Sequence, residues 1–371
     1  MKISLSNKKE LLEALNKVQS VVEKRNTLQI LSNIYLQVQN ESLTLKATDL
    51  EVSIETSLPV RMLEGGKSTV SAKNFFEIVR ELPEKEVQIH SKENHWIGIQ
   101  CGKSNFNILG LAPEDFPTLP SFSGKTGVKA KKDVLKSMID HTLYAVSTDE
   151  SRYQLNGVYL ETAENGNYRM VAADGYRLAY FEDKLLDEGK DFLPKGIIIP
   201  RKGIQEVRKL LDAETAAVVD LAVEGNHLLV KGQTTFLSVR LIEGQFPDYR
   251  QVVPKNNSKS IELDRSEFLN SLKRVSLLAN EKSRGVKFAI SNGKLEISSN
   301  NPEIGEASEQ IETAYKGETL EVGFNAKYVL DSVAVMTEDN ILFELNDRVS
   351  PALVRSPKGA SSLSVVMPMR I

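Results

Sequence analysis

The chain has 371 residues, of which 41% are hydrophobic and 26% are charged, and its formal net charge is −3. This length predicts two or three domains, and because no apolar run approaches the roughly 20 residues that cross a bilayer, the sequence excludes a membrane-spanning helix. The nearly neutral charge provides no general attraction to nucleic acid, so a nucleic-acid site would have to come from local clusters of cations.

The first residues and the cysteine content indicate the compartment. The opening string, MKISLSNKKELLEAL, becomes polar within a few positions and lacks the apolar core of a secretory signal. The single cysteine, Cys101, excludes an internal disulfide framework and a multi-cysteine metal site. We therefore expect a cytoplasmic protein.

Three segments carry the apolar periodicity of an amphipathic helix, and they define the first half of a repeat. They are residues 8–22, 131–147 and 264–282. Leu12, Leu135 and Leu269 then occupy equivalent places. Each segment is followed by an alternating strand, at residues 31–38, 155–162 and 284–290.

A second helix and a closing strand complete each copy of the repeat. The second helices are expected at residues 71–82, 200–211 and 325–336. Lys73, Lys202 and Lys327 begin them in matching positions. The closing strands are expected at residues 106–111, 236–241 and 363–371. The order of helix, strands, helix and strands thus occurs three times, which predicts three domains at residues 1–122, 123–253 and 254–371.

Two similar phrases follow the first two closing strands. They are APEDFPTLP, with Phe116-Pro117, and EGQFPDYRQ, with Phe246-Pro247. An isolated match would be a proline turn with a buried phenylalanine. Because both phrases fall at the same place in the repeat, we interpret them as the exit from one copy into the next. The third copy ends the chain at VVMPMRI and has no such phrase.

The arrangement of the elements predicts the fold class. Each copy contributes two helices and several hairpin-spaced strands, without the alternation of strand and helix that builds a parallel sheet. The sequence therefore predicts an α+β fold with antiparallel sheets, in which each copy has one helical face and one exposed sheet face.

Residues typical of catalysis or metal binding are scarce. The four histidines, at positions 90, 95, 141 and 227, are scattered, and there is no P-loop, dinucleotide fingerprint or nucleophile elbow. Asp174 and Arg177 could serve as an acid and an anion clamp, but Asp-Gly is more typical of a turn in which Gly175 has a positive φ. We expect no catalytic residue, no cofactor and no metal.

The polar faces of the expected helices carry a modest basic excess. Its members are Lys8, Lys9, Lys17, Lys131, Lys132, Lys136, Arg265, Lys273 and Arg274 on the first helices, and Lys73, Arg201, Lys202, Arg208, Lys209 and Lys327 on the second. Any one such face is an ordinary solvated surface. Copies related by an approximate rotation would place these faces together, and a helix about 21 Å long passes roughly 12 phosphates of duplex DNA. Such contacts hold the backbone without reading bases.

Several strings, taken together and in order over the full length, resemble one family. They are TDLEVSIE, RYQLNGVYLE, VAADGYRLA, IIPRKG, FPDYRQVVPK, NEKSRGVKF, GFNAKYVLD and VVMPMRI. The resemblance is to the β subunit of bacterial DNA polymerase III, the replication sliding clamp. It implies three clamp domains per chain, a head-to-tail homodimer, and a six-domain ring around double-stranded DNA. It also implies a non-catalytic role: the ring tethers the catalytic subunit of the replicative polymerase, is loaded by a clamp loader and binds other proteins with clamp-binding motifs.

The resemblance carries over two sets of binding residues. DNA contacts are implied for Arg25, Lys73, Arg152, Tyr153, Arg201 and Lys202. A partner-peptide pocket is implied for Leu155, Ala173, Gly175, Tyr176, Arg177, Leu178, Pro247, Val252, Asn325, Tyr328, Val349, Val366, Met367, Pro368, Met369 and Arg370. Gln154, Ala173 and Tyr176 depart from commoner family residues, namely tyrosine, threonine and histidine. Paired methionines give a deformable apolar surface, although without the family they could equally be edge-strand core.

A third set concerns the ring interface. Phe106 and Ile108 are expected to face Leu277 and Leu278 of a partner chain. Lys103 is expected to pair across the seam with Glu303, Glu306 or Glu309, which would guide orientation more than affinity. The alternative for Phe106 is burial within its own domain.

Two other functional classes remain open from the residues alone. One is a monomeric adaptor that binds peptides through VVMPMRI and never contacts DNA. The other is a hydrolase that uses Asp174 and Arg177.

Overall fold

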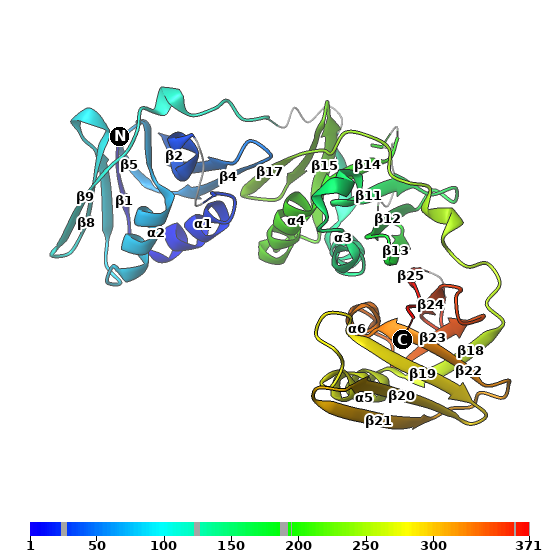
Figure 1. The fold of residues 1–371 in the computed structure, drawn as a ribbon. Coiled ribbons are helices and arrows are strands. Elements are labelled where there is room, and N and C mark those ends of the chain that lie inside the picture. The colour runs from blue at the N-terminus through cyan, green and yellow to red at the C-terminus, as the bar shows by residue number, and fades with distance from the viewer. Residues whose placement is uncertain (24–27, 122–126, 186–191, 194, 360, 371) are drawn as a thin grey trace. The chain divides into compact units, whose positions relative to one another are not determined.

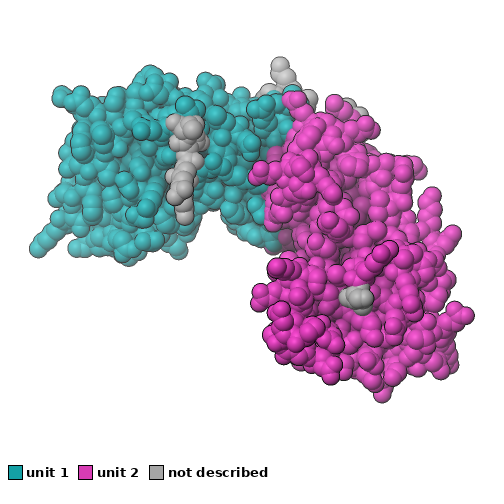
Figure 2. All heavy atoms as spheres, in the orientation of Figure 1, with its two compact units in different colours: residues 1–132, 186–192, 202–241 teal, residues 133–185, 193–201, 242–371 magenta. Residues whose placement is uncertain are grey.

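The computed structural model describes residues 1–23, 28–121, 127–185, 192–193, 195–359 and 361–370 (Figure 1). They form two compact units, which Figure 2 shows in different colours. Unit 1 comprises residues 1–132, 186–192 and 202–241, and unit 2 comprises residues 133–185, 193–201 and 242–371. Both units combine helices with antiparallel sheets, so the predicted α+β class is confirmed.

Six α-helices occur in the described residues, two for each copy of the repeat. They are α1 (Lys9–Gln19), α2 (Ala72–Glu81), α3 (Lys132–Asp140), α4 (Arg201–Ala213), α5 (Arg265–Ser276) and α6 (Ala326–Ala334). Side-chain caps begin several of them: Ser71 accepts from the amide of Asn74 at α2, and Asn325 accepts from the amides of Lys327 and Tyr328 at α6. All six expected helices are therefore present.

Helix α3 is shorter than its sequence pattern predicts. The apolar periodicity extends to residue 147, but the helix ends at Asp140. The hydroxyl of the buried residue Thr142 donates to the carbonyl of Met138 at 2.7 Å. The amide of Thr142 bonds the carbonyl of Ile139, three residues back, at 3.1 Å, so the hydroxyl takes the place of this amide at Met138 and the chain leaves the α-helix in a tighter turn.

Unit 1 contains two antiparallel sheets. The first has the strand order β5 (Arg61–Glu64), β1 (Lys2–Leu5), β7 (Val87–Ser91), β8 (Trp96–Cys101), β9 (Ser104–Leu109). The second has the order β10 (Val128–Lys131), β15 (Val218–Glu224), β16 (His227–Lys231), β17 (Thr235–Arg240), β4 (Val52–Pro59), β3 (Ser42–Thr48), β2 (Asn33–Gln39), β6 (Gly66–Ser71). Helix α1 packs beside α2 and against β3 and β4, burying Leu11, Leu15 and Val18 (Figure 1).

Unit 2 also contains two antiparallel sheets. One has the order β14 (Ile197–Pro200), β11 (Gly157–Thr162), β12 (Tyr168–Ala173), β13 (Arg177–Asp183), β25 (Ser362–Val366), β24 (Ala352–Arg355), β23 (Asn340–Leu345), β18 (Lys259–Asp264). The other has the order β21 (Gly305–Glu312), β20 (Lys294–Asn301), β19 (Gly285–Ser291), β22 (Leu320–Asn325). Helices α5 and α6 pack together beside these strands, around the buried rings of Phe268, Phe288, Phe324 and Phe343.

Each eight-stranded sheet is continuous across two copies of the repeat. In unit 1 the closing strand of the second copy, β17, pairs with the fourth strand of the first copy, β4, and places Leu237 opposite Ile54. In unit 2 the closing strand of the third copy, β25, pairs with the fourth strand of the second copy, β13, and places Val365 opposite Leu178. Adjacent copies are therefore joined by the same pair of strand edges.

The two repeated phrases have equivalent surroundings. Phe116 lies with its ring centroid 5.3 Å from that of Tyr35, on β2, and Phe246 lies 5.0 Å from Tyr159, on β11. Tyr35 and Tyr159 occupy matching positions in the second strands of their copies. The side-chain packing thus supports the interpretation of the phrases as equivalent exits.

Candidate functional site

An apolar groove with a volume of about 160 Å³ lies in unit 2 where β13 meets the closing strand β25. Its lining includes residues expected from the sequence: Leu155, Ala173, Gly175, Arg177, Leu178, Pro247, Val252 and Met367. It also includes Phe246, Asp248, Tyr249 and Val365, which were not expected. The structure therefore gathers half of the expected pocket residues around one concave apolar surface.

Aromatic residues of the second exit phrase form the base of this groove. Phe246 and Tyr249 are buried against Leu178 and Val365 in one core cluster. The hydroxyl of Tyr249 donates to Glu161 at 2.5 Å and accepts from Arg169 at 2.8 Å. Burial, together with the hydrogen bond to the Glu161 carboxylate, raises the pKa of Tyr249 to about 12. The ring is thus held in place and stays neutral at physiological pH. The phrase itself, FPDY, was the available sequence signal.

The end of the chain begins at the groove, which Met367 lines, and continues to β22. The amide of Met367 donates to the carbonyl of Tyr176 at 2.9 Å, and the amide of Met369 donates to that of Gly323 at 2.9 Å. Val366 is fully buried in the core of the third copy, so the alternation of β25 directs its neighbour Val365 toward the groove. Pro368 and Met369 are half-buried, and Arg370 is exposed.

Several other expected pocket residues lie outside the lining of the groove. Val349 has 79% of its surface exposed, and Asp347 caps its turn by accepting the amides of Val349 and Ser350 at 2.9 and 2.7 Å. Tyr176 and Tyr328 stack with their ring centroids 6.5 Å apart, and both line the larger, polar concavity described next. The exposed valine and the stacked tyrosines are thus further apolar side chains at the surface of unit 2.

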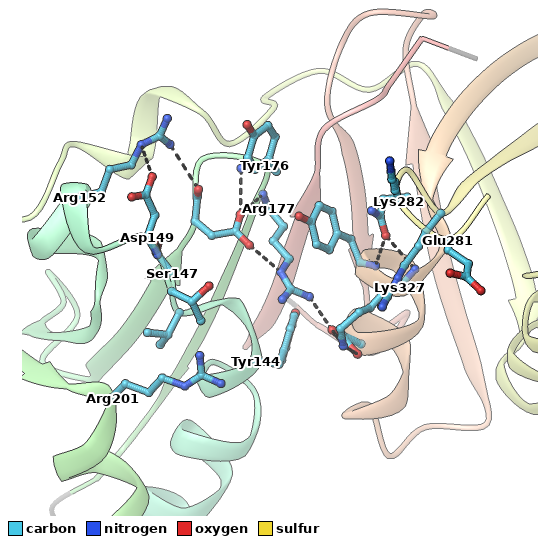
Figure 3. A pocket seen from close by; sticks show the side chains of 17 residues that line it. Tyr144, Ser147, Asp149, Arg152, Tyr176, Arg177, Arg201, Glu281, Lys282 and Lys327 are labelled. Atoms are coloured by element: carbon cyan, nitrogen blue, oxygen red, sulfur yellow. Dashed lines mark hydrogen bonds and ion pairs between the residues drawn. The ribbon is translucent and has the colours of Figure 1, made fainter. Parts of the chain in front are cut away.

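A second concavity, the polar cavity, lies beside the groove and has a volume of about 710 Å³ (Figure 3). Its lining residues are Tyr144, Val146, Ser147, Thr148, Asp149, Arg152, Asp174, Tyr176, Arg177, Arg201, Glu281, Lys282, Arg284, Asn325, Lys327, Tyr328 and Asp331. Arg177 lines both the polar cavity and the apolar groove. The turn from Asp174 to Arg177 is therefore their common wall.

The Arg177 guanidinium is enclosed by two carboxylates and two aromatic rings. It donates from Nε to Asp174 at 3.0 Å and from Nη1 to Asp331 on α6 at 2.6 Å. Its central carbon lies 4.5 Å from the ring centroid of Tyr328 and 5.4 Å from that of Tyr144. Burial raises the pKa values of both tyrosines. Arg177 thereby fastens the groove wall on β13 to helix α6.

Asp174 acts as the cap of its own turn. Its Oδ1 accepts the amides of Tyr176 and Arg177, both at 2.9 Å, and Gly175 has a φ of +90°. These contacts match the turn interpretation and occupy the carboxylate, which weakens the hydrolase hypothesis. Within the described part of the chain, no group of three or more His, Cys, Asp or Glu residues is arranged to hold a metal ion.

Replacing Arg177 with glutamine is expected to destabilise unit 2 by about 2–3 kcal/mol, because two largely buried carboxylates lose their shared counterion. The side chains of Asp174 and Asp331 are only 14% and 24% exposed. Lys327→Gln is the control, because Lys327 is 48% exposed and its loss should cost less than about 1 kcal/mol. Urea titrations of both variants measure the difference, and equal midpoints would contradict this role for Arg177.

The residues expected to contact DNA lie on helix starts and one turn. Arg25 lies outside the described residues. Lys73 is exposed in the first turn of α2, in unit 1. Arg152 and Tyr153 belong to a 3-10 turn, Glu150–Leu155, in unit 2, where Tyr153 is 56% exposed. Arg201 begins α4 and lines the polar cavity.

Lys202 is engaged by acidic residues of unit 1. Its ammonium lies 2.9 Å from Glu23 and also forms an ion pair with Asp49, whose side chain is 3% exposed. Partial burial of Lys202 is outweighed by these two partners, which raise its pKa. Lys202 therefore links the first and second copies of the repeat, and much of its charge is neutralised within the chain.

The residues expected at the ring interface lie on free strand edges or beside them. Phe106 and Ile108 are on β9, an edge strand, and Phe106 is 38% exposed. The alternative that Phe106 is buried within its own domain is therefore wrong. Leu277, which follows α5, is 77% exposed, and Leu278 is half-buried.

Lys103 and its expected partners are also exposed, with one exception. Glu309 is only 27% exposed and already accepts two bonds from Arg274, at 2.5 and 2.6 Å. This pairing lowers the pKa of Glu309. Glu303 and Glu306 are exposed, which leaves them as the candidates for Lys103.

Comparison with known proteins gives a consistent result along the whole chain. Models of the N-terminal, central and C-terminal domains of the DNA polymerase III beta subunit match residues 1–120, 129–248 and 250–370. The chain is 38% identical over 366 residues to the beta sliding clamp of Caulobacter vibrioides, covering 97% of this chain and 98% of the relative. It is 37% identical over 363 residues to that of Pseudomonas aeruginosa, with the same coverage. A solved structure of a sliding clamp from Bartonella birtlesii bound to griselimycin matches with a TM-score of 0.95 at 36% identity, and the match covers both chains completely.

No helix in the described ranges is long and apolar enough to cross a membrane.

Proposed function

Because the chain belongs to the DNA polymerase III beta subunit family, the beta sliding clamps, which are processivity factors and not catalytic polymerase subunits, we propose that two copies close head to tail into a ring around duplex DNA. The ring holds a replicative polymerase on its template while it slides. Three domains per chain, at residues 1–122, 123–253 and 254–371, then give six domains in the ring, in the cytoplasm.

The pattern of strand pairing supports a head-to-tail contact. The closing strands β17 and β25 each pair with the fourth strand of the preceding copy, β4 and β13. Among the described residues, the closing strand of the first copy, β9, has no such partner, and neither does the fourth strand of the last copy, β21, since both are sheet edges. Pairing β9 of one molecule with β21 of another repeats the same junction a third time. The contact joins two different surfaces, so each molecule uses one surface for each neighbour. Two molecules satisfy both surfaces when they close into a ring.

The exposed apolar residues near these edges support the same contact. Phe106 and Ile108 lie on β9. Leu277 and Leu278 follow α5 along the chain, before β19 begins. A backbone ladder without side-chain burial would be weak, whereas apolar residues at its centre provide most of the affinity of an interface. Pairs between Lys103 and Glu303 or Glu306 would orient the approach.

We assign the DNA contacts to phosphate-binding side chains at helix starts and turns. The described members are Lys73, Arg152, Tyr153 and Arg201. Arg25 lies outside the described residues and is assigned from the family resemblance alone. Phosphate contacts hold any sequence equally, which suits a protein that slides. Lys202 contributes less than the others, because Glu23 and Asp49 neutralise it. A closed ring needs only weak contacts, since it cannot dissociate sideways.

We assign the apolar groove and the adjoining surface to partner peptides. The groove offers Met367, Val252 and Leu178 to apolar side chains, and Val349, Tyr328 and Met369 extend the surface. A largely apolar groove with few polar groups is typical of sites that bind short linear motifs. Motifs of the polymerase catalytic subunit, the clamp loader and other clamp-binding proteins would compete for it. A relative has been crystallised with griselimycin, and we propose that this compound also binds here.

The single observation that carries the proposal is family membership over the whole chain. A primer-extension assay tests it. With the polymerase, the clamp loader and ATP on a primed circular template, adding this chain should lengthen the products made in one binding event, whereas without the loader it should have little effect. Products of unchanged length with both present would contradict the proposed function.

A further inference from the structure

The polar cavity next to the apolar groove has an excess of unpaired positive charge. Its cationic lining residues are Arg152, Arg177, Arg201, Lys282, Arg284 and Lys327, and its acidic ones are Asp149, Asp174, Glu281 and Asp331. Arg177 and Lys327 are paired with carboxylates of the cavity, and Arg152 lies 3.7 Å from Asp149. Arg201, Lys282 and Arg284 form no ion pair with any described residue. These three remain available to an anionic ligand.

The loop that carries two of these cations is held in an uncommon conformation. Arg284 has a φ of +51°, in the left-handed region that an arginine seldom adopts. Its amide donates to the carbonyl of Asn280 at 2.7 Å, and its carbonyl accepts the amide of Ala326 at 2.8 Å. The side chain of Asn280 also accepts the amide of Lys282 at 3.0 Å. Backbone strain of this kind persists where the surroundings enforce it, and it is concentrated at binding sites.

The cavity and the groove are adjacent. Asp174 and Tyr176 line the cavity, Gly175 lines the groove, and Arg177 lines both. Figure 3 shows Tyr176 and Arg177 in the wall of the cavity. A peptide whose apolar side chains occupied the groove would therefore carry its neighbouring residues over the cavity. Carboxylates on those residues would meet Lys282 and Arg284, whereas Arg201 remains assigned to DNA.

We propose that the polar cavity binds acidic residues that flank the apolar motif of a partner peptide. This inference rests on the proposed peptide-binding function of the groove and adds a specificity to it. Arg152 and Arg201, at one side of the cavity, are assigned to DNA. The region of Lys282 and Arg284 favours a peptide, because the cavity is also lined by four carboxylates, which would repel a DNA strand whose closely spaced phosphates filled it. Isolated aspartates or glutamates can instead be placed next to the free cations.

The test uses four versions of one clamp-binding peptide of the polymerase catalytic subunit. Three Asp or three Asn residues are added at its N-terminal end or at its C-terminal end. Fluorescence anisotropy at low salt measures the affinities. At one of the two ends, the peptide with three Asp residues should bind about three- to tenfold more tightly than the peptide with three Asn residues, as expected for two or three exposed ion pairs. Added salt should remove the difference.

Variants localise the effect. Lys282→Gln combined with Arg284→Gln should abolish the preference for Asp and leave the affinity for the Asn peptides unchanged. The matched control is Lys294→Gln combined with Lys316→Gln, which removes the same charge from the opposite end of β19, roughly 23 Å away along a seven-residue strand. The control should keep the preference, and thermal melts should show that both variants are folded.

Three outcomes would overturn the inference and can be told apart. Equal affinities for Asp and Asn at both ends would remove the acidic specificity while leaving the groove function intact. Displacement of the Asp peptide by a single-stranded oligonucleotide that itself depends on Lys282 and Arg284 would assign the cavity to nucleic acid. Failure of every peptide to bind the unaltered protein would refute the proposed groove function, and this inference with it.

Discussion

Replacing Leu277 with aspartate is expected to convert the proposed dimer into monomers. Leu277 is 77% exposed in the isolated chain, so the substitution should not disturb folding. In the proposed ring it enters an apolar contact, where an unpaired carboxylate costs at least about 2 kcal/mol per interface. Two such interfaces close one ring, so the dimer should weaken by roughly 1000-fold. Sedimentation equilibrium measures the change.

The matched control is Leu63→Asp. Leu63 is also an exposed leucine, at 51%, but it lies on β5, the opposite edge of the sheet that contains β9. This variant should remain a dimer. Monomers from both variants, or dimers from both, would show that β9 and Leu277 do not form the interface.

A mixture of two variants tests the head-to-tail geometry itself. Phe106→Asp and Leu277→Asp should each be monomeric alone. When the two are mixed, the Leu277→Asp chain keeps its Phe106 and the Phe106→Asp chain keeps its Leu277. These two intact surfaces can form one of the two interfaces of the ring. The mixture should therefore associate, but as an open dimer that is not retained on circular DNA.

Removing residues 367–371 is expected to reduce the affinity for the polymerase peptide by at least about 100-fold, equivalent to roughly 2.7 kcal/mol. Met367 forms part of the groove, and the following residues are tied to β22 through the bond from Met369 to Gly323. Strand β25 ends at Val366 and stays paired with both β13 and β24, so the fold should persist. Isothermal titration calorimetry measures the loss.

The conservative variant Met367→Leu serves as the control for this deletion. It keeps an apolar side chain of similar volume and should bind within severalfold of the unaltered protein. Both proteins should keep the oligomeric state of the unaltered protein, because residues 367–371 do not belong to the proposed ring interface. An unchanged affinity after the deletion would show that the chain end does not belong to the peptide site.

Much of the fold followed from local patterns. The apolar spacing of residues such as Leu11, Leu15 and Val18 predicted the helices, because packing a helix requires an apolar stripe. The early end of α3 was not predictable, since it depends on where Thr142 directs its hydroxyl. Nor did the sequence indicate that β17 would pair with β4, because the backbone bonds of a strand edge are the same for every sequence.

The site was less completely predictable than the fold. Phe246, Tyr249 and Val365 were missed, because a buried apolar residue has the same sequence signal whether it fills a core or forms the floor of a groove. The pairing of Lys202 with Asp49 joins residues far apart in the chain, and no local pattern encodes it. The family resemblance supplied the pocket residues, and the geometry adds which of them share one surface.

Retention on DNA before and after linearisation tests the closed ring most directly. Labelled protein is loaded onto nicked circular DNA, the salt concentration is raised, and the circle is then cut once with a restriction enzyme. The ring predicts that the protein stays on the circle in salt that removes it from linear DNA, because counterion release weakens ionic contacts but not topological linkage. It also predicts prompt loss after the cut. Release from the intact circle at the salt concentration that releases it from linear DNA would contradict encirclement.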